Sequence, residues 1–125
     1  MNIAVKNLVL SYETLANQAV KFNQAYLQLL KIYEELILAP DWFAELEESG
    51  VSPFSAITSM QTEQQVIISK FQELSQLIAK SQLHFLNNPE AEALGNIAKD
   101  SQLMIDFVNT IDLADLQDMF IKIKK

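Results

Sequence analysis

The fold of this chain is decided by residues 5–36, VKNLVLSYETLANQAVKFNQAYLQLLKIYEEL. Apolar side chains recur there at alternating intervals of three and four residues, at Val5, Leu8, Tyr12, Leu15, Ala19, Phe22, Tyr26, Leu29, Tyr33 and Leu36. This spacing is the a/d register of helices that pack in bundles and coiled coils. No glycine or proline interrupts it before Pro40, which disfavours helical geometry at the preceding residue. The stretch therefore predicts one helix of about 35 residues.

Further apolar residues widen this stripe, namely Val9, Ala16, Val20, Leu27, Leu30 and Ile37. A helix with so wide an apolar side contacts more than one neighbour, which indicates a bundle. Two neighbouring arms can hardly cover all of it, and leftover apolar surface usually marks an interface. We therefore expect a homodimer, or an obligate partner, docked along the first and second arms, with Tyr26 and Leu27 among the contact residues and Trp42 and Phe43 near its end.

Proline and glycine mark the first connection. Pro40 ends the long helix, and Asp41 is placed to act as the N-cap of a short helix over residues 42–48. Gly50 follows as the residue that ends this short helix in left-handed conformation.

Ser52 and Pro53 repeat the helix-start signal of an N-cap serine with proline at the first helical position. The next helix either runs continuously from Pro53 or restarts near Thr62, where Thr62 and Gln65 fit a capping box. Its core positions are Ile57, Met60, Ile67, Phe71, Leu74, Ile78 and Phe85, with Gln64 and Ser81 as polar interruptions.

The last arm begins after Asn88, the expected cap, with Pro89 opening the helix. Its buried positions are Leu94, Ile97, Met104, Ile105, Val108 and Ile111. The register fails at 109–112, and Asp112 then caps a segment with a new apolar face at Leu113, Leu116, Phe120 and Ile123. We predict a single all-α domain over residues 1–125: an antiparallel bundle of three long helical arms, with a short helix in the first connection and a kinked or split last arm.

The composition argues against catalysis. Cysteine is absent, which removes disulfides, thiol nucleophiles and cysteine-bound metals. His84 is the only histidine, and no acidic residue lies three or four positions from it. Two distant glycines, Gly50 and Gly95, cannot form a glycine-rich phosphate loop. We expect no catalytic residue, no cofactor and no metal ligand, and hence no enzyme.

The charge is strongly negative. The net charge is −7, and all nine basic residues are lysine. Without arginine or a basic stripe, direct binding to nucleic acid or to an anionic membrane is not expected. No signal peptide or membrane span is recognisable, which favours a cytoplasmic protein. The abundance of lysine, asparagine, isoleucine and glutamine without arginine is compatible with an AT-rich bacterial or phage genome.

The connection between the first two arms is unusually apolar. It holds Trp42, Phe43 and Phe54, whereas helix connections are normally polar. These side chains either seal one end of the bundle or anchor a partner protein. The acidic residues Asp41, Glu45, Glu47 and Glu48 would favour a basic partner there.

Three aspartates recur at every third position in the last arm, Asp112, Asp115 and Asp118. They are expected to form a solvated acidic face, and the two other interpretations are a surface for a basic protein and a site for a hard cation. Taken together, these features predict a non-catalytic interaction protein that self-associates: an accessory, adaptor, chaperone-like or assembly factor. The alternative is an acidic inhibitor or immunity-type protein that blocks a basic enzyme or a nucleic-acid-binding site.

Overall fold

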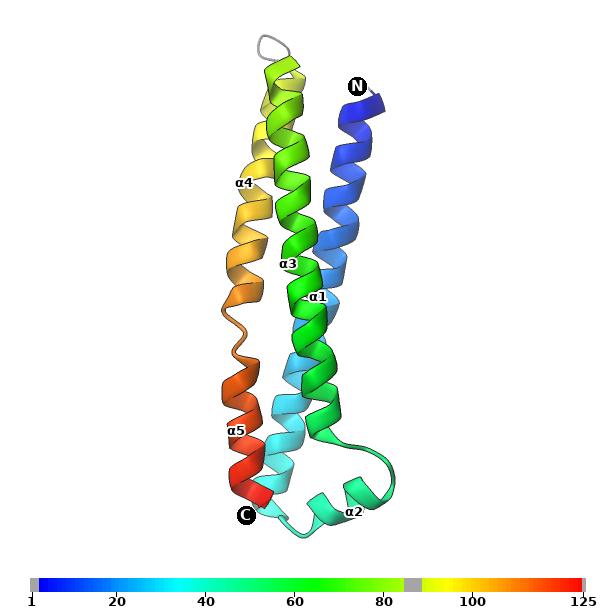
Figure 1. Ribbon diagram of the computed structural model, residues 1–125, viewed down its shortest axis with the longest axis vertical. Coiled ribbons are helices and arrows are strands. Elements are labelled where there is room, and N and C mark those ends of the chain that lie inside the picture. Colours follow the sequence, from blue (N-terminus) through cyan, green and yellow to red (C-terminus); the bar gives the residue numbers. More distant parts are fainter. Residues whose placement is uncertain (1–2, 85–88, 125) are drawn as a thin grey trace.

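Three long helical arms lie side by side in the structure (Figure 1). It is a computed structural model that describes residues 3–84 and 89–124. Its elements, all helical within these residues, are α1 (Ile3–Leu38), α2 (Trp42–Glu48), α3 (Pro53–His84), α4 (Glu90–Asn109) and α5 (Leu113–Lys124). The arm α3 returns antiparallel to α1, and α4 and α5 together form the third arm (Figure 1). The predicted all-α bundle, with its short connecting helix and split last arm, is confirmed.

The core lies along the axis shared by the three arms. The ten a/d side chains of α1 are all buried or half-buried, as the register predicts. Each arm contributes one of the three largest fully buried side chains, which are Phe22 of α1, Phe71 of α3 and Phe120 of α5. The bundle therefore has one core that runs through both halves of the split arm.

The start of α2 differs from the prediction. Asp41 occupies the N-cap position but makes no side-chain capping bond, because its own backbone is already helical (φ −64°, ψ −24°). The first amides of the turn bond to main-chain oxygens instead, Trp42 N–H to Ala39 at 3.0 Å and Phe43 N–H to Pro40 at 3.1 Å. The capping role expected of Asp41 is therefore wrong.

The end of α2 follows the prediction. Gly50 has φ +84°, the left-handed conformation that glycine adopts without a Cβ clash. Its N–H donates to the Glu47 carbonyl at 3.1 Å, and Val51 N–H donates to the Leu46 carbonyl at 2.9 Å. These two bonds form a Schellman motif, which ends α2 and turns the chain toward α3.

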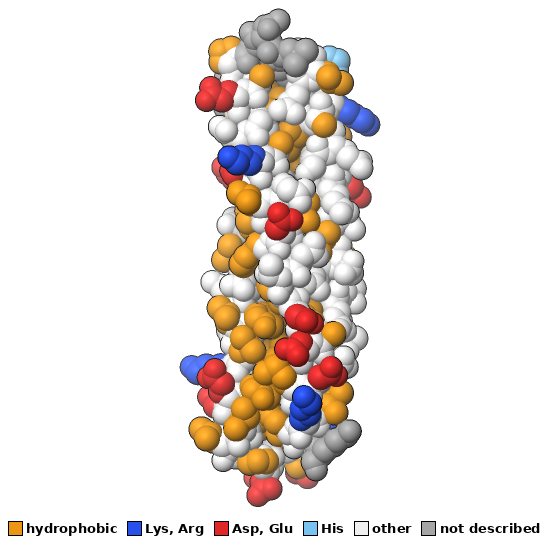
Figure 2. Space-filling view, turned by 90° about the vertical axis from the view of Figure 1, so that its left-hand side faces the viewer, with side chains coloured by type: hydrophobic (Ala, Val, Ile, Leu, Met, Phe, Trp, Pro, Cys, Tyr) orange, Lys and Arg blue, Asp and Glu red, His pale blue; other side chains and the backbone are white. Residues whose placement is uncertain are grey.

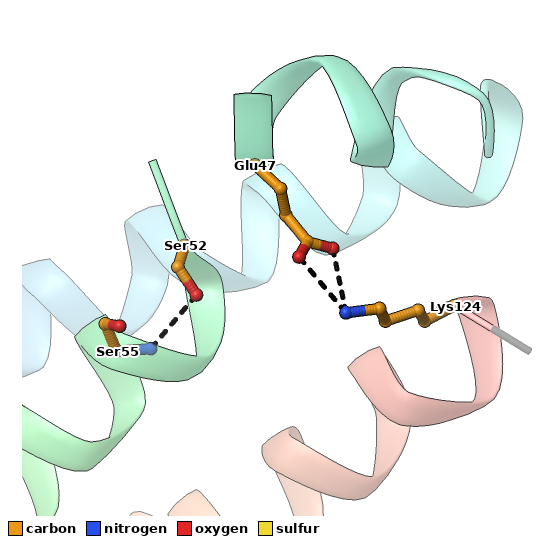
Figure 3. A network of polar contacts seen from close by, with 4 residues as sticks. All are labelled: Glu47, Ser52, Ser55 and Lys124. Atoms are coloured by element: carbon orange, nitrogen blue, oxygen red, sulfur yellow. Dashed lines mark hydrogen bonds and ion pairs between the residues drawn. The ribbon is translucent and has the colours of Figure 1, made fainter. Parts of the chain in front are cut away.

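The start signal of α3 is also confirmed. The Ser52 hydroxyl oxygen accepts a hydrogen bond from Ser55 N–H at 3.3 Å (Figure 3), and Pro53 is the first helical residue. From there α3 runs without interruption. The Thr62 hydroxyl donates to the carbonyl of Thr58 in the preceding turn, at 3.4 Å, so no new helix starts at Thr62.

At the start of the third arm, the expected cap Asn88 and the core position Phe85 lie outside the described residues. Pro89 precedes α4 at its N-cap position, and Glu92 N–H donates to the Pro89 carbonyl at 3.2 Å.

The split between α4 and α5 is stabilised by polar side chains from both sides. Asp112 caps α5, since its Oδ1 accepts a hydrogen bond from Asp115 N–H at 2.9 Å. From α3, the Gln64 side-chain amide donates to the carbonyls of Val108 and Ile111, both at 2.9 Å. The polar interruption of the α3 seam at Gln64 therefore faces carbonyls that the split leaves without helical partners.

Burial along α3 gives the first test of the fold. Leu74 is 4% exposed, whereas Leu77, one turn further on, is 52% exposed. We expect Leu74→Ala to lower the free energy of unfolding by about 2–5 kcal/mol through lost burial and a residual cavity. The matched variant Leu77→Ala should change it by less than about 1 kcal/mol. Urea denaturation followed by circular dichroism measures both, and equal losses would show that the faces of α3 are misassigned.

The hydrogen bonds across the split give a second test. We expect Gln64→Ala to destabilise the protein by about 1–3 kcal/mol, because the Ile111 carbonyl loses this donor and the Val108 carbonyl keeps only the 3.3 Å bond from Ile111 N–H. Its exposed neighbour provides the control, and Gln65→Ala should stay within about 0.5 kcal/mol of the wild type. Amide hydrogen exchange should also quicken around the split in the Gln64 variant alone. Unchanged exchange there would contradict this role.

Candidate functional site

No cluster of side chains suited to metal binding is present in the described residues. His84 is exposed at the end of α3. No three histidine, cysteine, aspartate or glutamate side chains gather as a metal site within residues 3–84 and 89–124, so Asp112, Asp115 and Asp118 do not converge on a cation. None of the described helices combines the length and the apolar character that a membrane crossing requires.

An aromatic cluster closes the end of the bundle at α2. Phe43 is only 3% exposed, and its ring centroid lies 5.8 Å from that of Phe54 and 6.2 Å from that of Phe120. Trp42 beside it is half-buried against the core. Sequence reasoning left open whether this segment seals the bundle or binds a partner. For Phe43 the structure shows the sealing role, and Trp42 and Phe54 keep part of their surface exposed.

Lys124 holds this cluster in place from α5. Its Nζ lies 3.1 Å from each carboxylate oxygen of Glu47 on α2 (Figure 3). The same Nζ lies 5.9 Å from the ring centroid of Phe43 and 5.5 Å from that of Phe54. A cation over aromatic faces adds attraction to the ion pair. Sequence reasoning did not find this contact, because no local pattern pairs residues so far apart.

Two of the a-register tyrosines of α1 contact aromatic rings of the other two arms. The Tyr33 ring meets Phe120 of α5 edge to face, with centroids 5.7 Å apart, and Tyr12 packs on Phe71 of α3 at 6.3 Å. Burial raises the pKa of Tyr12 above its usual value, and the Asp100 carboxylate of α4 raises it further. These contacts place α1 in the angle between α3 and the third arm.

One side of α1 stays partly uncovered where it packs along α5. Leu27 and Ile37 are 52% and 50% exposed, and further apolar side chains around them are half-buried. We call this surface the α1–α5 stripe, made up of Val20, Tyr26, Leu27, Leu30, Tyr33 and Ile37 of α1 with Met119 and Ile123 of α5. Figure 2 shows apolar side chains gathered along the lower half of this face of the bundle, beside a row of acidic ones.

The acidic residues of α5 belong to the same end of the molecule. Asp112, Asp115 and Asp118 are all exposed. Because α5 packs against α1, these carboxylates lie on a direct neighbour of the helix that carries Tyr26 and Leu27, which sequence reasoning had selected from a different arm. Apolar and acidic side chains therefore share one face at this end of the bundle (Figure 2).

Apart from the stripe, an open groove lies between α1 and α3. It has a volume of about 530 Å³, and its walls include Leu10 and Thr14 of α1 and Lys70, Glu73 and Leu77 of α3. Lys70 and Glu73 carry opposite charges, so this groove has neither the continuous apolar lining nor the net charge of the α1–α5 stripe.

Comparison with protein-family models, curated proteins and solved structures found no match to the chain. The α1–α5 stripe is therefore the candidate binding site.

A third test separates capping from surface charge among these aspartates. Asp112 accepts the capping hydrogen bond of α5, whereas Asp118 lies in its second turn and is exposed. We expect Asp112→Ala to lower the free energy of unfolding by about 1 kcal/mol. The control Asp118→Ala should change it by no more than about 0.5 kcal/mol. Thermal and urea unfolding measure both, and equal effects would mean that the cap contributes nothing.

Proposed function

We propose that this chain is a non-catalytic interaction protein, such as an accessory, adaptor, chaperone-like or assembly factor, that binds another protein through the α1–α5 stripe. The observation that carries the proposal is the exposure of Leu27 and Ile37 beside half-buried tyrosines on one continuous face. A few residues carry most of the binding energy in protein interfaces, and tyrosine is among the most frequent of them.

Self-association through the same stripe is part of the proposal. The first arm is electrically neutral, with Lys6, Lys21 and Lys31 against Glu13, Glu34 and Glu35. Two copies that meet along α1 bury apolar surface, while the net charge of −7 on each opposes their approach. The resulting dimer should be discrete, and weak at low ionic strength.

The fourth test is the effect of salt concentration on the dimer, for which the proposal predicts a definite direction. Added salt screens repulsion between like-charged copies and leaves apolar contact intact, so we expect the dimer fraction to rise between 50 and 500 mM NaCl. Sedimentation velocity at micromolar concentration measures it against the 14.2 kDa monomer. Leu27→Glu should abolish the dimer, and Leu77→Glu should leave it intact. The two leucines are equally exposed, at 52%, on different helices.

Circular dichroism of each variant is the control for folding. Both leucines are half in solvent, so helicity should be unchanged in both variants. A dimer that survives Leu27→Glu but dissociates with Leu77→Glu would move the interface to the α1–α3 groove. A monomer at every salt concentration would contradict self-association and leave binding of a different protein as the remaining form of the proposal.

A further inference from the structure

The negative charge of the molecule is concentrated at the end that carries the α1–α5 stripe. We count as this end residues 26–57 and 110–124, which comprise the second half of α1, α2 with its connections, and α5 (Figure 1). Its nine acidic residues are Glu34, Glu35, Asp41, Glu45, Glu47, Glu48, Asp112, Asp115 and Asp118, against Lys31, Lys122 and Lys124. This end therefore has a net charge of −6, whereas the other described residues, with seven acidic residues and five lysines, carry −2.

The ion pair at this end leaves its net charge unchanged. Lys124 lies within 3.1 Å of both carboxylate oxygens of Glu47, so this pair contributes no net charge, and eight acidic residues remain against the exposed Lys31 and Lys122. Asp112, Asp115 and Asp118 are exposed along α5, and Glu34 and Glu35 are exposed on α1. The uncovered apolar residues thus have acidic side chains on both bordering helices.

We propose that the α1–α5 stripe receives a basic amphipathic helix of a partner protein. The apolar face of that helix would cover Leu27, Leu30 and Met119, and its lysines or arginines would meet the carboxylates of Asp115 and Asp118. This inference rests on the proposed function and adds the chemistry of the occupant. Binding of an amphipathic helix in an apolar groove is a common mode of protein recognition. The contact residues of such a helix are spaced three and four positions apart.

The dimensions of the stripe suit such a ligand. From Val20 to Ile37 the stripe follows α1 for 17 residue steps, or about 25 Å at 1.5 Å per residue. A partner helix of about 18 residues has the same length. Tyr26 and Tyr33 are half-buried at the bottom of this surface, and each combines an apolar ring with a hydroxyl that can bond to a polar group.

Charge favours this occupant over a second copy. A dimer along the stripe brings two ends of net charge −6 together, whereas a basic helix neutralises one of them. The two occupants therefore respond to salt in opposite directions: the dimer strengthens as salt rises, and the complex with a basic helix weakens. A basic helix should also displace the second copy, because both need Leu27.

The experiment uses the full chain and a fluorescein-labelled 18-residue peptide with leucine on one helical face and lysine on the other. A permuted peptide of the same composition, without the apolar face, is the peptide control. Fluorescence anisotropy is measured at 50 and 300 mM NaCl. We expect binding of the amphipathic peptide, at least about tenfold tighter than that of the permuted one, and weaker binding at the higher salt concentration.

Variants then locate the site. Leu27→Glu should weaken peptide binding about tenfold even though it adds a negative charge, while the equally exposed Leu77→Glu should not weaken it. The pair Asp115→Asn and Asp118→Asn should weaken binding about threefold to tenfold at 50 mM NaCl and flatten its salt dependence. The matched pair Glu63→Gln and Glu73→Gln, exposed on α3, removes the same charge elsewhere and should leave the affinity within about twofold.

Two results overturn the inference. If Leu27→Glu binds the peptide as tightly as the wild type or more tightly, the contact is one of charge alone, as expected of an acidic inhibitor. If the aspartate pair and the α3 pair behave alike, the acidic border of the stripe has no role. Sedimentation distinguishes failure of this inference from failure of the proposed function. If the chain dimerises and Leu27→Glu dissociates the dimer, the stripe is a binding surface, and its occupant is a second copy.

Discussion

The structure depends on one constraint, which is that α1 must pack against two neighbours at once. Its a and d positions supply the contacts, with Tyr12 on Phe71 of α3 and Tyr33 on Phe120 of α5. A helix in the angle between two others buries a broad strip and leaves its remaining sides outside. Because the apolar positions of α1 extend beyond that strip, Leu27 and Ile37 are left partly in solvent. The same register therefore produces both the core and the candidate binding surface.

Breaks in the helices show how a bundle tolerates interruptions. Each break leaves amides or carbonyls without helical partners, and buried ones are costly. At Gly50 a left-handed turn provides partners for these groups, and at Ser52 and Asp112 side-chain caps do so. At the split, the Gln64 side-chain amide donates from α3 to the carbonyls of Val108 and Ile111. The split last arm thus keeps its direction without a continuous helix.

Local patterns predicted the helices, their buried faces and most of their ends, because periodicity and capping act over a few residues. Contacts between distant segments were not predictable in the same way. Whether Phe43 is core or surface depends on Phe54 and Phe120, and the role of Lys124 depends on Glu47. Asp41 failed as a cap for a related reason, since the turn from α1 sets its backbone in helical geometry. For the candidate site, sequence reasoning selected residues from separate arms, and packing of α1 on α5 was needed to join them.

Apolar and acidic residues at one end of this bundle would contribute to different stages of binding. Carboxylates act over about a Debye length of 10 Å at 0.1 M salt, so an end of net charge −6 accelerates the approach of a positively charged partner. Apolar contact acts only after water has been displaced, and it determines mainly how long the complex lasts. An inhibitor that relied on charge alone would have no need of exposed leucine beside its acids. Within the proposed function, the exposure of Leu27 on the helix that packs against the acidic α5 favours an apolar docking surface over a site that relies on charge alone.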